Sequence, residues 1–71
     1  MNYTAGSLVR RKVGGVVGVL MASEPDEQTN KGYMLEIAFG YLTKFDAQIN
    51  KSFSTQWAIV HSSHIEIIGS Q

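Results

Sequence analysis

Positive charge is concentrated in Arg10-Arg11-Lys12, a run of contiguous cations near the start of the chain. Such a run could bind the phosphates of a nucleic acid, and Lys44 or Lys51 could extend the patch. The aromatic side chains that could stack on bases are Tyr33, Tyr41 and Trp57. The candidate contact set for a nucleic acid or a protein partner is therefore Arg10, Arg11, Lys12, Lys44 and Lys51.

Strand geometry favours a simpler explanation of the same cations. Successive side chains of a strand point to opposite faces, so Arg10 and Lys12 would share one face while Arg11 lies on the other. Lysine and arginine on edge strands also block aggregation between sheets. The run alone does not predict a binding site.

Histidines and serines gather near the C-terminus, but their spacing does not predict catalysis. His61 and His64 lie three apart with Glu66 nearby, whereas a zinc site needs further ligands that converge. We expect no metal here, and we expect His64 to help cap a turn. Ser62 and Ser63 adjoin His61, but sequence neighbours rarely form a catalytic triad. These hydroxyls more simply satisfy local backbone groups.

Length and composition limit the class of protein. The 71 residues make one domain, residues 1–71, with 44% hydrophobic residues and six Lys/Arg balancing six Asp/Glu. No cysteine is present, so disulfides and thiolate metal sites are excluded, and nothing points to a cofactor. The chain has no signal-peptide pattern and no apolar run of about 20 residues, so we expect a cytoplasmic protein. A core this small favours self-association.

Two strand patterns flank Gly14-Gly15 at the start of the chain. Ser7–Val13 and Val16–Ala22 are rich in β-branched residues, and the glycine pair can adopt the positive φ of a tight hairpin turn. Gly18 inside the second pattern predicts a bulge or a bend. The polar segment Ser23–Lys31 then predicts an exposed loop.

Tyr33–Phe39 is the clearest strand of the chain, with alternation that places Leu35, Ile37 and Phe39 on a core face. Glu36 would point to solvent. Residues 40–56 remain open: the strand could continue or cross over through Phe45, and Asp46–Gln56 fits a helical turn as well as a packed loop.

The C-terminal segment predicts two short strands around one turn. Trp57–Val60 and Ile65–Ile68 are apolar, and Ser62-Ser63-His64 leaves room only for a single helical turn between them. Trp57 is predicted as the core anchor. Its expected contacts are Val9, Val17 and Leu35.

Two stretches resemble the SH3-like barrel. Gly6-Ser7-Leu8-Val9-Arg10-Arg11-Lys12, followed by Gly-Gly and Val-Val-Gly-Val, is similar to the opening of small phage proteins and KOW-type modules, with Ser7 at a frequent aspartate position. Residues 57–68 resemble the family's strand, 3₁₀ turn and last strand. The resemblance implies an all-β, five-stranded SH3-like barrel with one 3₁₀ turn before the last strand. The alternative for Trp57 is the exposed aromatic residue of a peptide groove, as in true SH3 domains, but the Ala-Leu-Tyr-Asp-Tyr-like stretch of those domains is absent from the sequence.

Type II dihydrofolate reductase has the same barrel, and this chain resembles it only distantly. That family carries Val-Gln-Ile-Tyr where this chain has Trp57-Ala58-Ile59-Val60, without the glutamine or the tyrosine. None of its active residues is therefore carried over.

Three functional hypotheses follow. The first is a phage-like, non-enzymatic interaction or assembly module that forms a homo-oligomer or docks on a larger protein, with no membrane partner. If the chain is phage-encoded, it would reside in the host cytoplasm or the virion. The second is a KOW-like nucleic-acid binder that uses Arg10, Arg11 and Lys12. An enzyme is the third.

Overall fold

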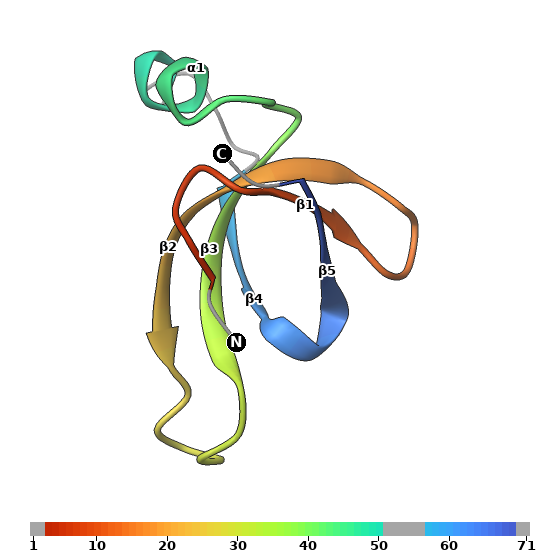
Figure 1. Cartoon of the computed structure of the whole chain (residues 1–71). Helices are drawn as coiled ribbons and strands as arrows, with labels where there is room; N and C mark the ends of the chain where they lie inside the picture. Colours follow the sequence, from red (N-terminus) through yellow and green to blue (C-terminus); the bar gives the residue numbers. More distant parts are fainter. Residues whose placement is uncertain (1–2, 51–56, 70–71) are drawn as a thin grey trace.

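Five antiparallel strands form a single sheet in the order β4-β3-β2-β1-β5 (Figure 1). The structure, a computed structural model, describes residues 3–50 and 57–69. Its elements are β1 (Leu8–Arg11), β2 (Val17–Pro25), β3 (Tyr33–Phe39), α1 (Lys44–Ile49), β4 (Trp57–His61), a 3₁₀ turn (Ser62–His64) and β5 (Ile65–Gly69). The predicted fold class is confirmed: five strands, all antiparallel, with one 3₁₀ turn before the last strand.

The main core lies on the concave side of the curved sheet. Its buried residues are Val9, Leu20, Leu35, Ile37, Phe39, Val60 and Ile65. The predicted alternation of β3 is confirmed, because Leu35, Ile37 and Phe39 all belong to this cluster while Glu36 lies half exposed on the other face. The 3₁₀ turn joins the two edge strands, which brings the ends of the sheet together (Figure 1).

Helix α1 covers part of the convex face of the sheet. Thr43 caps it by accepting a hydrogen bond from the backbone N–H of Asp46 at 3.1 Å. Ala47 is its buried residue and packs with Val19, Met21 and Ala38 in a second cluster. Lys44–Ile49 is therefore helical rather than a continuation of the strand, and the rest of the open segment, residues 51–56, lies outside the described residues.

Trp57 does not anchor the main core as expected. It is partly buried against the second cluster, with Val19 and Ala38, and not against Val9 and Leu35. The reason is its position on β4: Trp57 pairs with Ala38, whose side chain faces α1. The expected packing partners were wrong because the sequence did not show that the convex face has its own helix.

The predicted bulge is at a different position. Gly18 pairs regularly with Val9 and Phe39, and the β2–β3 register shifts between Leu20 and Ala22 instead. Met21 is the extra residue, and it lies in the second cluster. Because one residue is inserted, the alternation of β2 reverses beyond Met21.

Strand β2 runs further than its apolar pattern predicted. Ser23, Glu24 and Pro25 pair with Leu35, Met34 and Tyr33, so the predicted loop Ser23–Lys31 begins only at Asp26. Propensity missed these residues because they are polar or proline, but cross-strand pairing at the end of a sheet tolerates them. The β2–β3 connection is therefore shorter than predicted, and it positions Asp26 and Lys31 beside His61.

Candidate functional site

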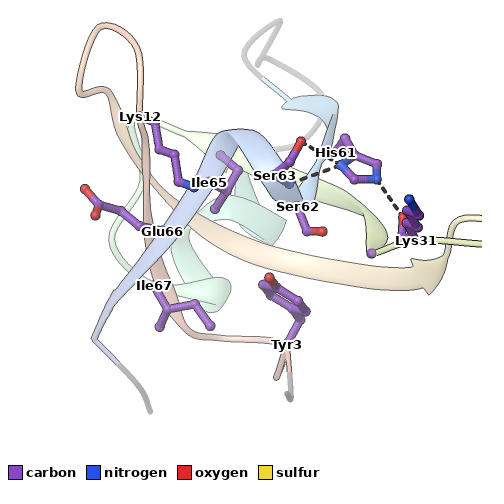
Figure 2. Close-up of a pocket in the computed structure, with 10 residues that line it drawn as sticks. Tyr3, Lys12, Lys31, His61, Ser62, Ser63, Ile65, Glu66 and Ile67 are labelled. Carbon is purple, nitrogen blue, oxygen red and sulfur yellow. Dashed lines mark hydrogen bonds between the residues drawn. The ribbon is translucent and has the colours of Figure 1, made fainter.

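A groove of about 740 Å³ opens where the 3₁₀ turn, β5, the β2–β3 loop and the N-terminal segment meet (Figure 2). Most of its surface is apolar, contributed by Tyr3, Ile65 and Ile67. Figure 2 shows Lys12 and Lys31 at opposite ends of this lining, with the 3₁₀ turn between them. The groove is therefore mostly apolar, with a lysine at each end.

The β1–β2 hairpin holds Lys12 in place. Its turn closes through a hydrogen bond from the Gly15 N–H to the Arg11 carbonyl at 3.1 Å, with Gly14 and Gly15 both at positive φ, as predicted for a glycine turn. The Lys12 N–H in turn donates to the His64 carbonyl at 2.9 Å. The lysine backbone is thus fixed against the 3₁₀ turn, while its side chain is exposed.

Lys31 is positioned by the short loop after β2. The hydroxyl of Thr29 accepts a hydrogen bond from the Lys31 N–H at 3.3 Å, and Asn30 (φ 57°) and Gly32 (φ 70°) are in the left-handed conformation. A side chain at Gly32 would also meet the Ser62 hydroxyl at 2.6 Å. The loop therefore packs directly against the 3₁₀ turn.

His61 connects this loop to the 3₁₀ turn. Its Nδ1 accepts from the Ser63 N–H at 3.1 Å, and its Nε2 lies 2.9 Å from the Lys31 carbonyl. A backbone N–H only donates and a carbonyl only accepts, so the ring is the neutral tautomer with its proton on Nε2. The side chain that caps the turn is His61 and not His64, which corrects the expectation.

Asp26 completes the same network. Its carboxylate accepts from the Thr29 hydroxyl at 2.8 Å and from the backbone N–H groups of Gln28 and Thr29, and lies 3.3 Å from His61 Nε2. The hydrogen bond from the Thr29 hydroxyl, with smaller contributions from the two backbone N–H groups, holds the pKa of Asp26 below its usual value. Asp26 therefore stays ionised beside the groove at neutral pH.

The serines of the turn bond to groups within the network. Ser63 Oγ lies 2.8 Å from His61 Nδ1, and the Ser62 hydroxyl accepts from the Tyr33 N–H at 3.0 Å. Ser62 thus ties the turn to β3 rather than to a local backbone group. His61 lies between the Ser63 hydroxyl and the Asp26 carboxylate, as the histidine of a catalytic triad lies between its serine and aspartate. However, His61 Nδ1 already accepts a hydrogen bond from the backbone N–H of Ser63. This arrangement fits a side chain that caps the 3₁₀ turn.

Replacing His61 by alanine should lower the free energy of unfolding by about 2 kcal/mol, since the change removes a cap and the link to the Lys31 carbonyl. His64→Ala is the matched control. The His64 side chain is exposed, and the backbone carbonyl that accepts from Lys12 remains, so we expect a loss of at most about 0.5 kcal/mol. Urea denaturation followed by the fluorescence of Trp57 measures both. Equal losses would contradict the capping role.

The structure separates the cations that the sequence placed together. Arg10 binds Glu66, with Nη2 and Nε 2.6 and 2.7 Å from Oε1, and Arg11 lies over the Phe39 ring at 5.1 Å. Lys44 begins α1, at the other end of the molecule from the β2–β3 loop (Figure 1). Lys51 lies outside the described residues. Among the described members of the predicted set, only Lys12 lines the groove, and its side chain forms no ion pair with a described acid.

Lys31 and His61 are the groove residues that the charge pattern did not indicate. Lys31 looked like an ordinary loop cation, and its position depends on contacts with residues about 30 positions later. The polar composition of Ser23–Lys31 was the only sequence feature that marked this loop.

Among the described residues, no group of three His, Cys, Asp or Glu side chains could hold a metal ion. Over the same residues, no helix is long and apolar enough to cross a membrane. Comparison with known proteins gives no matching family model, curated protein or solved structure.

Proposed function

We propose that this chain is a non-enzymatic protein-docking module whose groove receives an apolar surface that carries carboxylates. The observation that carries the proposal is that Lys12 and Lys31 line an otherwise mostly apolar groove. Neither lysine forms an ion pair with any described residue. Apolar contact area supplies affinity, and complementary charge at the rim sets orientation and speeds association.

Nucleic acid is the less favoured ligand for the same groove. Glu66 also lines it, but its carboxylate is paired with Arg10, so the net positive charge of the groove comes from Lys12 and Lys31 alone, which is little for a phosphate backbone with one charge per nucleotide. Arg10 is already engaged with that carboxylate, so it contributes little additional positive charge. On a protein partner, apolar side chains can contact the apolar centre of the groove while acidic side chains meet Lys12 and Lys31 at its ends.

The test is a titration with a synthetic extended peptide that alternates isoleucine and aspartate, followed by ¹⁵N–¹H NMR. We expect chemical-shift changes at Lys12, Lys31 and Ile67, because these line the groove. Neutralising both lysines (Lys12→Ala with Lys31→Ala) should weaken binding about fivefold to tenfold, as expected for two rim charges. Lys44→Ala, on α1 and outside the groove, should leave the affinity unchanged.

Two further probes separate the alternatives. The same peptide with lysine in place of aspartate should not bind, because it would place like charges beside Lys12 and Lys31. A single-stranded oligonucleotide at about 50 mM salt, where electrostatic binding is strongest, should also leave the spectrum unchanged. Tighter binding of the oligonucleotide than of the acidic peptide would contradict the proposal, and so would an absence of groove shifts at millimolar peptide.

A further inference from the structure

A second hollow, of about 290 Å³, lies on the convex side of β2, β3 and β4. It is lined by Ala22, Glu24, Met34, Glu36 and Ile59, and we call this surface the acidic face. The register places these residues together: Ala22 pairs with Glu36, Glu36 with Ile59, and Glu24 with Met34. The inserted Met21 is the cause, because without it Ala22 and Glu24 would point to the opposite side.

The acidic face is open to solvent and apolar at its centre. Helix α1 packs on Val19 and Ala38 of the same convex side and does not reach the acidic face. Ile59 is 69% exposed, which is unusual for an isoleucine in the middle of a strand. Neither Glu24 nor Glu36 forms an ion pair within the part of the chain that the structure describes.

The acidic face has the chemistry that the groove requires. The groove combines Tyr3 and Ile67 with two lysines, and the acidic face combines Ile59 and Met34 with two glutamates. Building on the proposed docking function, we propose that the occupant of the groove is the acidic face of a second copy of this chain. In each contact the apolar centre of the groove would meet the apolar centre of the acidic face. Lys12 and Lys31 of one copy would meet Glu24 and Glu36 of the next.

This contact is heterologous and can propagate. The groove and the acidic face have no residue in common, so one copy can use both surfaces at once. Contacts between two different surfaces produce closed rings or open filaments, depending on the rotation between neighbours. An interface of about 800 Å² per partner takes about a sixth of the 4757 Å² surface of the chain, so two such contacts fit on each copy.

Charge reversal tests which surfaces meet. One variant carries Lys12→Glu with Lys31→Glu, and the other carries Glu24→Lys with Glu36→Lys. Sedimentation velocity of the wild-type chain, from about 10 μM to about 1 mM, should show association that weakens as salt is raised. Each variant alone should associate at least about tenfold more weakly, because like charges then face each other. An equimolar mixture of the two variants should associate again.

The control is Lys44→Glu, which reverses a lysine outside both surfaces and should associate like the wild type. Recovery in the mixture also shows that both variants are folded. A monomeric wild-type chain at 1 mM would overturn the inference, as would unchanged association of either variant or no recovery on mixing. If the aspartate peptide still shifts the groove residues of a monomeric chain, the docking function stands and only its occupant is wrong.

Discussion

Gly18→Ala is expected to lower the free energy of unfolding by about 3 kcal/mol, because the strand interior has no space for one methyl group. A Cβ atom at Gly18 would lie 2.8 Å from the Ala38 carbonyl oxygen and 2.9 Å from the Phe39 Cα. Both atoms belong to the backbone of β3, so the clash cannot be relieved by rotating a side chain. The two strands would have to separate at the centre of the sheet.

Gly69→Ala is the matched control for this prediction. Gly69 is also a strand residue, but its Cβ would meet only the Leu8 side chain, at 3.6 Å, which is an ordinary contact. We expect a change within about 0.5 kcal/mol. Thermal and urea denaturation of both variants measures the difference, and a similar small effect at the two glycines would contradict the close approach at Gly18.

Leu20→Ala should be similarly damaging, with a loss of about 3 to 4 kcal/mol in the free energy of unfolding. Leu20 is fully buried in the main core, where it packs with Val9, Leu35 and Ile37. Truncation removes apolar contacts and leaves a cavity that the surrounding strands cannot fill. A domain of this length has about 4 to 10 kcal/mol of stability in total, so the variant should be partly unfolded at 37 °C.

The same substitution on the surface provides the comparison. Leu42 is 61% exposed in the segment before α1, so Leu42→Ala should change the free energy of unfolding by no more than about 0.5 kcal/mol. Trp57 is the only tryptophan of the chain and reports unfolding in both variants. Equal losses at the two leucines would show that Leu20 does not pack in the core as described.

The candidate site was predictable only in part. Lys12 belonged to the predicted contact set, and the 3₁₀ turn was predicted at Ser62–His64. The split of the cations was also anticipated, because side-chain alternation follows from backbone geometry alone. What alternation could not show is that Glu66 neutralises Arg10, since that contact depends on the pairing of β1 with β5.

The missed features share one cause. His61 bonds to Lys31 and lies beside Asp26, and Trp57 packs against the cluster that contains Val19, so each contact joins segments that are far apart in the sequence. The acidic face depends in addition on one inserted residue, Met21, which changes the side of the sheet that Glu24 faces. A local pattern carries no information on where such an insertion falls.

The sequence by itself determined the number and order of the strands, the glycine hairpin, the 3₁₀ turn and the core side of β3, because period-two alternation and turn chemistry act between near neighbours. Only the tertiary structure decided the helix over the convex face, the position of Trp57, the contact of His61 with the Lys31 carbonyl and the two surfaces with opposite charge. Those features come from strand pairing and from the bulge in β2, where long-range packing overrides local preference.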